Sequence, residues 1–376
     1  MKVILRKKSV ITGKKNLEHL YSFHDFPVYM GCVEKLNPGD DLKAEMSFSI
    51  CKDMGMIQLD KVLPLDVVYK KSHSDGIGKV WSDHYRKFAD FVVSFGVKNV
   101  LEIGGGNGMV AKNAVRRNSH ISWIILEPNP LFRGDKKIKV IKGWFNEQYT
   151  SDDKFDVLVH SHVLEHVYQP REFLRSVFKF LKEGDKHIFA VPNLYKSLKN
   201  KNTNTLNFEH TVFLTEYFVD YLLKREGFKI LKKEYYLDHS IYYATERLNR
   251  NERIRCQSKY EEYKKIFNQF IRFHESLIKT FNQQIKSFQG ELYLFGAHIF
   301  SQSLLGFGLN SEKIKSILDN SKLKQGKRLY GTSYLVYSPE ILKNKKSSGV
   351  ILRAGPYQKE IKDQLLGINK KTIIFE

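Results

Sequence analysis

The residues best suited to chemistry begin with a run of glycines in the first third of the chain. Residues 100–103 form an apolar stretch typical of a buried parallel strand, and Gly104, Gly106 and two further glycines follow it. Residues 110–115 then show helical periodicity. A strand, a glycine turn and a helix present backbone N–H groups to a ligand, and glycine permits a close approach that a Cβ would block. The pattern therefore predicts a nucleotide-like ligand at this turn.

Two carboxylates indicate which ligand that is. Glu102 lies just before the turn, and Glu127 ends the second predicted strand, 121–126, where an acid can accept both hydroxyls of a nucleoside ribose. A dinucleotide fingerprint needs a third glycine three residues past Gly106, and this chain has none at that position. A carboxylate near the turn suits an amino-bearing cation better than a pyrophosphate. We therefore predict S-adenosylmethionine rather than NAD, bound by Glu102, Gly104, Gly106 and Glu127.

Further polar side chains follow the fourth predicted strand, 156–160. His162, Glu165 and His166 come directly after it. Because the carboxyl ends of parallel strands meet at one edge of a sheet, we expect these side chains near the glycine turn. We predict that His162 contacts the cofactor beside its sulfonium.

The elements that position these residues alternate between strands and helices, which predicts an α/β fold with a doubly wound parallel sheet. Strands are predicted at 100–103, 121–126, 140–141, 156–160 and 187–191, and helices at 79–92, 110–115 and 170–181. Residues 246–289 have a long, charged helical pattern and predict a connecting helix. Residues 290–376 repeat the strand–turn–helix pattern around Gly296 and predict a second, smaller α/β unit.

The N-terminal segment, residues 1–75, combines short apolar runs with prolines and predicts short strands and loops. Cys51 resembles half of a Cys-x-x-Cys zinc knuckle whose second cysteine is missing, and His19, His24 and Cys32 are the residues that could join it. A zinc site needs thiolates or imidazoles in pairs. We therefore expect Cys51 to be a small core residue and no zinc or other metal to bind.

Residues 79–230 resemble the class I S-adenosylmethionine-dependent methyltransferases, most clearly in the segments 100–108, 155–159 and 162–170. The whole chain is similar to three-part sugar methyltransferases typified by deoxysugar C-methyltransferases. The resemblance implies four parts: a zinc-binding-like region (1–75), a Rossmann-like methyltransferase core (76–245), a helical connector (246–289) and a Rossmann-like substrate-binding domain (290–376). It implies methyl transfer to a sugar, nucleotide-linked, in surface polysaccharide biosynthesis.

The same resemblance implies roles for individual residues. The pair Glu209 and His210 matches the family's Glu-His motif, so His210 is expected to be a base near the sugar and Glu209 to orient it or contact the substrate. Loss of an acceptor proton suits a histidine at neutral pH. His73, Asn207 and His298 are expected to contact the substrate. C-methylating members carry a tyrosine where this chain has Asn207, which leaves both O- and C-methylation open.

Composition leaves two other functions to be considered. The net charge of +21 is compatible with an RNA or other nucleic-acid methyltransferase, but the lysines are scattered and form no compact basic arm, so we expect no nucleic-acid partner. A catalytically inactive cofactor-binding scaffold is the other alternative.

The sequence holds no run long enough for a membrane span, no secretory signal and only 3 cysteines, which predicts a cytoplasmic protein. It does not indicate the oligomeric state.

Overall fold

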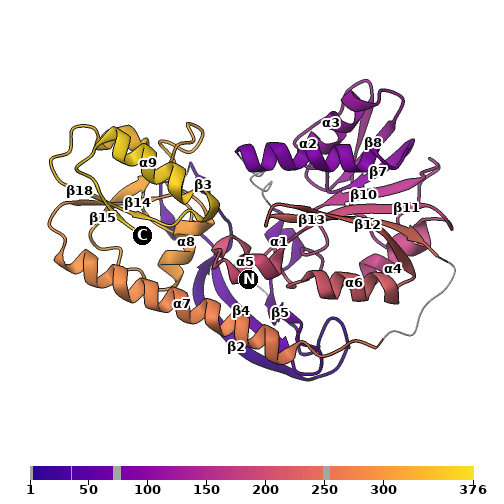
Figure 1. Cartoon of the computed structure of the whole chain (residues 1–376), viewed down its shortest axis with the longest axis horizontal. Helices are drawn as coiled ribbons and strands as arrows, with labels where there is room; N and C mark the ends of the chain where they lie inside the picture. The colour runs from indigo at the N-terminus through magenta and orange to yellow at the C-terminus, as the bar shows by residue number, and fades with distance from the viewer. Residues whose placement is uncertain (1–2, 35, 71–77, 249–254) are drawn as a thin grey trace.

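The computed structural model describes residues 3–34, 36–70, 78–248 and 255–376. Two α/β units lie at the two ends of an elongated molecule, and an N-terminal β region lies between them (Figure 1). The long helix α7 (Tyr260–Ser287) runs from the N-terminal β region to the C-terminal unit. Among the helices of the described ranges, none combines the length and apolar character that crossing a bilayer requires.

The larger unit is built on a seven-stranded sheet in the order β12-β13-β11-β10-β7-β8-β9. Five of its strands pair with one another in parallel, whereas β13 pairs antiparallel with both β11 and β12. The strands are β7 (Asn99–Ile103), β8 (Ser122–Glu127), β9 (Ile138–Lys142), β10 (Val157–Ser161), β11 (Lys186–Pro192), β12 (Phe228–Tyr236) and β13 (Ser240–Arg247). The predicted fold class is confirmed, and the five parallel strands lie where the sequence predicts them.

Helices cover both faces of this sheet. On one face lie α2 (Lys79–Val93) and α3 (Met109–Arg117), and on the other α4 (Pro170–Phe180) and α6 (Glu216–Arg225) (Figure 1). The central strands are apolar on both faces, as a covered parallel sheet requires. Short helices α1 (Leu65–Val68) and α5 (Leu194–Lys199) lie in the connections at the strand ends.

The C-terminal unit is a five-stranded parallel sheet in the order β17-β15-β14-β18-β19. Its strands are β14 (Glu291–Phe295), β15 (Ile314–Leu318), β17 (Val336–Tyr337), β18 (Ser348–Leu352) and β19 (Ile373–Phe375), with helices α8 (Ile299–Gly306) and α9 (Gln358–Ile368). The first strand of each unit lies between the second strand and a later one: β14 between β15 and β18, as β7 lies between β8 and β10. The two units therefore share one local topology.

The N-terminal region is an antiparallel sheet of β2 (Leu17–Pro27), β4 (Lys43–Cys51) and β5 (Ile57–Leu59), with a small ladder of β1 (Ile4–Leu5) and β6 (Lys61–Val62) beside it. Cys51 is fully buried, and its Sγ lies 3.4 Å from Asn16 Oδ1. Ile11 and Met54 are buried in the same apolar cluster. Apolar packing fills this region, and the absence of zinc stays a prediction.

This region is joined to the C-terminal unit far along the chain. Strand β3 (Cys32–Val33) pairs with β16 (Arg328–Leu329). The fully buried Arg328 forms a two-pronged ion pair with Asp41, at 2.5 Å from Nη1 to Oδ2 and 3.0 Å from Nη2 to Oδ1. A planar guanidinium paired in this way fixes the orientation of both partners. The N-terminal β region and the C-terminal unit are thus held together by strand pairing and by a buried ion pair.

Candidate active site

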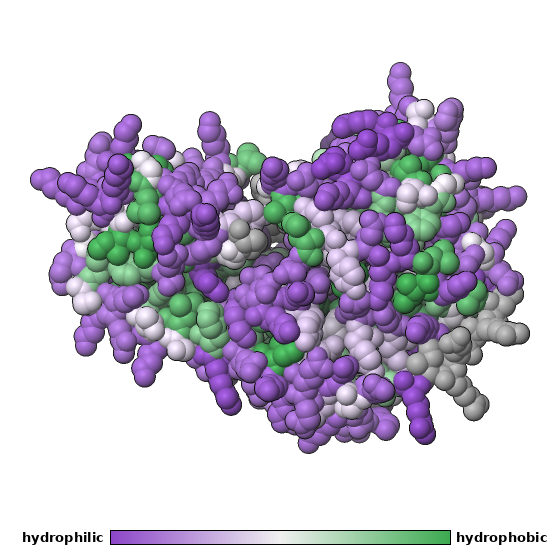
Figure 2. Space-filling view, in the orientation of Figure 1, coloured by the Kyte–Doolittle hydropathy of each residue, from purple (hydrophilic) through white to green (hydrophobic). Residues whose placement is uncertain are grey.

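A cavity of about 1010 Å³ lies between the two α/β units. Its walls come from the turn after β7, the loops after β8, β10 and β11, and the turn after β14. Figure 2 shows the hollow between the two lobes of the surface. All of these segments follow the carboxyl ends of parallel strands, where α/β sheets bind their ligands.

The glycine turn after β7 has room only for glycine. Gly104 has φ +70°, and a Cβ there would lie 2.7 Å from Val163 Cγ2. A Cβ on Gly105 would lie 2.7 Å from Ile125 Cγ2. The N–H of Gly106 donates to Glu127 Oε2 at 3.2 Å. The acid at the end of β8 therefore lies across the turn, and four of the five residues predicted for the cofactor, Glu102, Gly104, Gly106 and Glu127, line one end of the cavity.

Glu102 is the buried carboxylate of this end. Trp123 Nε1–H donates to its Oε2 at 2.7 Å. Burial raises the pKa of Glu102 to about 7, although the bond from Trp123 opposes the shift, and nearby Glu127 adds to it. A cationic ligand stabilises the ionised form of such a group. The glycine cradle and the two carboxylates fit an adenosine bearing an amino group and a positive charge, as S-adenosylmethionine does.

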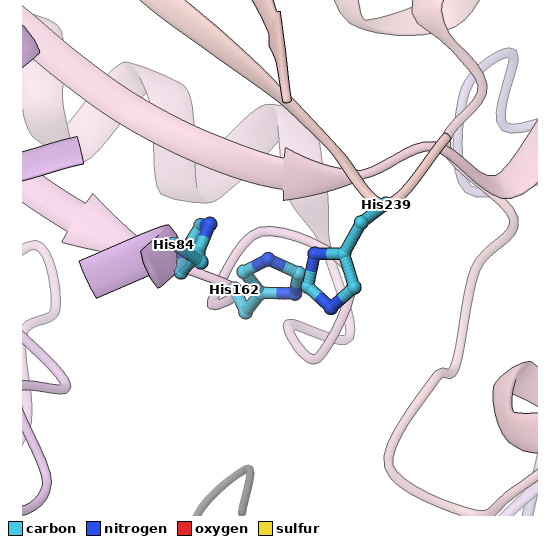
Figure 3. A group of neighbouring side chains, drawn as sticks. All are labelled: His84, His162 and His239. Atoms are coloured by element: carbon cyan, nitrogen blue, oxygen red, sulfur yellow. The ribbon is translucent and has the colours of Figure 1, made fainter. Parts of the chain in front are cut away.

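His162 follows β10 in a left-handed backbone conformation, with φ 55°. It lies in the middle of a row of three imidazoles, with His84 from α2 on one side and His239 from the β12–β13 turn on the other (Figure 3). Burial lowers the pKa of His162 and of His239 to about 3, and it lowers that of His84 well below the usual value. The row is therefore neutral at physiological pH, and Trp81 packs against it, 5.0 Å from the His162 ring.

Serine and tyrosine hydroxyl groups lie within hydrogen-bond distance of the nitrogens of these three imidazoles. His84 Nε2 lies 3.0 Å from Ser161 Oγ, and its Nδ1 lies 3.2 Å from the hydroxyl of Tyr242. Ser240 Oγ lies 3.0 Å from His162 Nε2 and 2.6 Å from His239 Nδ1. Sequence reasoning missed His239, because a histidine in the turn between β12 and β13 gives no periodic or motif signal.

A second polar group, Glu165, His166 and His210, lies in the same wall. One donor atom of each lies within 4.8 Å of the others. Glu165 is fully buried, and its Oε1 lies 3.8 Å from His166 Nε2. Burial raises the pKa of Glu165 to about 7 and lowers that of His210, while Glu165 and Glu209 act in the opposite direction on His210. His166 and His210 line the cavity.

The loop that carries His210 is shaped by Asn207. Asn207 Oδ1 accepts hydrogen bonds from the backbone N–H groups of Glu209 and His210, both at 2.9 Å. The Nδ1 of His210 bonds to the carbonyl of Thr205 at 3.1 Å. Asn207 lines the cavity, but its amide oxygen is used within the loop. Its predicted contact with the substrate stays a prediction, as do the roles of Glu209 and His210.

The far end of the cavity belongs to the C-terminal unit. Gly296, in the turn after β14, has φ +99°, and the next N–H, that of Ala297, donates to Asp319 Oδ2 at 2.8 Å. Lys324 Nζ lies 3.0 Å from the same oxygen. His298 lines the cavity, and burial lowers its pKa to about 4, but its predicted contact with the substrate stays a prediction. His73, the remaining predicted substrate contact, lies outside the described residues.

Arg353 is a cavity residue that sequence reasoning missed. It follows β18, the strand next to β14, and its guanidinium lies 5.3 Å from the centre of the Phe273 ring. Burial lowers the pKa of Arg353. Its position directly after the apolar run 349–352 is the signal that could have identified it, because the ends of strands are where α/β sheets place ligand-binding side chains.

Residues 78–233 match the family described as a methyltransferase domain, and residues 231–375 match the C-methyltransferase C-terminal domain. The ubiquinone biosynthesis O-methyltransferase of Aeromonas salmonicida (strain A449) is 26% identical over 106 residues, which cover 26% of this chain and 44% of that protein. This chain thus spans less than half the length of that curated relative.

Two solved structures resemble parts of the chain. The plantazolicin methyltransferase BpumL, solved with a substrate analogue and SAH, is 12% identical with a TM-score of 0.36, covering 45% of this chain and 83% of that one. The N-methyltransferase NodS from Bradyrhizobium japonicum WM9 is 16% identical with a TM-score of 0.35, covering 45% and 96%. The family matches bear out the predicted enzyme class, a methyltransferase: the chain matches a methyltransferase domain and, after it, the C-methyltransferase C-terminal domain.

Proposed function

We propose that the protein transfers a methyl group from S-adenosylmethionine to a nucleotide-linked sugar used in surface polysaccharide biosynthesis. The observation that carries this proposal is the single cavity shared by the two units. Carboxylates lie at its methyltransferase end, Arg353 and Lys324 lie at its C-terminal end, and the imidazoles of His166 and His210 line the same space. One cavity can therefore receive a cationic donor and an anionic acceptor together.

The methyltransferase end suits the donor. Glu102, Gly104, Gly106 and Glu127 would hold the cofactor, which supplies an electrophilic methyl group on its sulfonium when bound. Glu127 already accepts a hydrogen bond from Gly106 N–H, so its carboxylate is oriented toward the turn before any ligand arrives. Trp81 and the neutral imidazole row cover the side of the cavity next to His162 without adding a positive charge that would repel a sulfonium.

The C-terminal end suits an acceptor that carries phosphate. Arg353 offers a planar guanidinium that matches the geometry of phosphate oxygens. Lys324 is paired with Asp319, which places that ammonium beside the turn that starts α8. The charge of Glu209 raises the pKa of both His210 and His298 against the effect of burial. The loop that carries His210 therefore lies close to the turn after β14. An acceptor held by its phosphates at Arg353 can therefore extend its sugar toward His210.

His210 is proposed to take the proton that the acceptor loses. Its Nδ1 faces the carbonyl of Thr205, so Nδ1 carries the hydrogen and Nε2 has the lone pair. Methyl transfer from a sulfonium is an in-line displacement, and placement of the acceptor supplies most of the rate. The acceptor atom, oxygen or carbon, gains the methyl group as its proton leaves to His210.

The test is a screen of purified protein with S-adenosylmethionine and a panel of nucleotide-sugars, read by mass spectrometry for the gain of one methyl group. Free sugars and a short single-stranded RNA serve as matched acceptors. Product from a nucleotide-sugar alone supports the proposal, and methylation of the RNA in place of every nucleotide-sugar overturns it. Arg353→Gln should raise KM for the nucleotide-sugar and leave S-adenosylmethionine affinity unchanged, whereas Lys359→Gln, on the exposed side of α9, should change neither.

A further inference from the structure

We propose that Glu165, His166 and His210 form a binding site for one divalent transition-metal ion in the cavity wall. The site is argued from its own geometry, and only its part in catalysis rests on the proposed function. One donor atom from each residue lies within 4.8 Å of the other two. Ligand atoms that lie about 2.0–2.2 Å from a shared ion are about 3–4 Å apart, so small side-chain rotations complete the site.

The unpaired carboxylate of Glu165 is the first observation that points to a cation. Its side chain is fully buried, and within the part of the chain that the structure describes neither oxygen accepts a hydrogen bond. A buried carboxylate without a partner is costly, and native structures pair such groups or use them to coordinate metals. Two imidazole nitrogens lie nearby, His162 Nδ1 at 3.4 Å and His166 Nε2 at 3.8 Å, both measured to Oε1.

The outer hydrogen bonds of the two imidazoles are the second observation. His210 Nδ1 lies 3.1 Å from the carbonyl of Thr205, and His166 Nδ1 lies 3.3 Å from the hydroxyl of Tyr69. Histidine ligands characteristically bond through their other nitrogen to a carbonyl or a similar group, which fixes ring orientation and tautomer. Both Nδ1 atoms are engaged in this way, so Nε2 is the ligand atom of each ring.

The neighbouring row of His84, His162 and His239 is a useful contrast (Figure 3). Its nitrogens also lie within 4.8 Å of one another, but serine and tyrosine hydroxyls bond to both nitrogens of His84 and to one nitrogen each of His162 and His239. None of the three residues of that row carries a carboxylate, although Glu165 Oε1 lies 3.4 Å from His162 Nδ1. Hydrogen bonds therefore account for the geometry of the row, whereas within the described residues neither oxygen of Glu165 accepts a hydrogen bond.

Two imidazoles and one carboxylate favour ions such as Zn²⁺, Co²⁺, Mn²⁺ or Fe²⁺ over Mg²⁺ and Ca²⁺, which prefer oxygen ligands alone. His166 and His210 line the cavity, so the remaining coordination positions face the space assigned to the acceptor. An acceptor oxygen bound there has a lowered pKa and releases its proton to water more readily. With an ion bound, Nε2 of His210 would be a ligand and the proton would leave to water, so His210 is the base only in the ion-free enzyme.

The experiment uses full-length protein that has been treated with a chelator and dialysed. Titration with Co²⁺, followed by visible absorption, and with Zn²⁺, followed by calorimetry, should show one ion per chain. Glu165→Gln, which keeps the size of the side chain, and His210→Ala should each weaken binding more than about 10-fold. His239→Gln is the matched control from the hydroxyl-bonded row and should bind as the parent protein does.

Thermal unfolding and S-adenosylmethionine binding show whether each variant is folded. Absence of stoichiometric binding, unchanged binding by folded Glu165→Gln, or loss in His239→Gln instead would overturn the site. The outcome is separable from the proposed function: product from a nucleotide-sugar without any bound ion removes the metal site alone. A bound ion with no methylated sugar removes the proposed substrate alone.

Discussion

Glu127 and Asp319 occupy matching positions in the two α/β units. Each follows or ends the second strand of its sheet, and each accepts a hydrogen bond from the glycine turn beside it. Gly106 N–H donates to Glu127 at 3.2 Å, and Ala297 N–H donates to Asp319 at 2.8 Å. They differ in their remaining partners: Lys324 forms an ion pair with Asp319, whereas within the described residues backbone N–H groups are the hydrogen-bond donors to Glu127. A ribose can therefore compete for Glu127 more easily than for Asp319.

Replacing each acid separately tests this difference. Glu127→Ala should weaken S-adenosylmethionine binding about 10- to 100-fold, because it removes a charged acceptor of two hydroxyl hydrogen bonds. Asp319→Asn should leave that affinity unchanged. Isothermal titration calorimetry measures both. Equal losses in the two variants would contradict the assignment of the cofactor to the first turn.

His210→Ala should lower turnover by about 10²- to 10⁴-fold, the usual contribution of a positioned acid or base. Affinity for S-adenosylmethionine should be retained, because His210 comes from the loop before α6 and not from the glycine turn. Steady-state kinetics and cofactor titration separate the two effects. His120→Ala, at an exposed position outside the cavity, is the control, and unchanged turnover in His210→Ala would refute the role.

Asp41→Asn should destabilise the protein by about 3–5 kcal/mol, because it removes the charge of the carboxylate that forms a two-pronged ion pair with the buried Arg328. Urea denaturation measures the change. The exposed pair of Lys327 and Glu34 provides the comparison, and Lys327→Met should cost less than about 1 kcal/mol. Similar decreases in unfolding free energy for both variants would show that the buried Arg328 pair contributes no more stability than the exposed pair.

Stability should fall in mild acid because of His160 and His187. Both are fully buried, with their Nε2 atoms 3.0 Å apart, and burial lowers the pKa of His187 to about 3 and that of His160 well below its usual value. Below about pH 6.5 the unfolded chain binds protons that the folded chain does not, so the unfolding free energy decreases as pH falls toward 3.

Urea denaturation between pH 7.5 and 4.5 measures this slope. His187→Phe, which preserves the stack on Phe189, should flatten it, and His24→Gln at an exposed position should not. A slope that is unchanged in His187→Phe would assign the acid sensitivity to other groups.

The sequence could predict what depends on local pattern. Glu102, Glu127 and His162 follow apolar strands, and the parallel sheet brings the ends of such strands to one edge, so their convergence follows from the alternation of elements alone. His239 and Arg353 reach the same cavity from an edge turn and from a separate unit. No spacing in the sequence predicts that these two residues line the cavity, because their positions depend on how the two sheets pack against the N-terminal region.

The role of Asn207 shows the same limit on a smaller scale. A resemblance aligns it with a substrate-contacting position, yet its oxygen caps two backbone N–H groups of its own loop. Short polar side chains often bond to nearby backbone, and only the folded loop distinguishes that use from a contact with a ligand.

The pairing of β3 with β16 also dictates an order of events during synthesis. Residues 32–33 leave the ribosome early, but their partners, residues 328–329, emerge only after almost 300 further residues. At a synthesis rate of about 5–20 residues per second, β3 has no strand to pair with for roughly 15–60 s. The methyltransferase sheet can fold in that interval, but the wall formed by the C-terminal unit cannot yet exist. A nascent chain can therefore acquire its donor-binding turn well before it acquires a place for the acceptor.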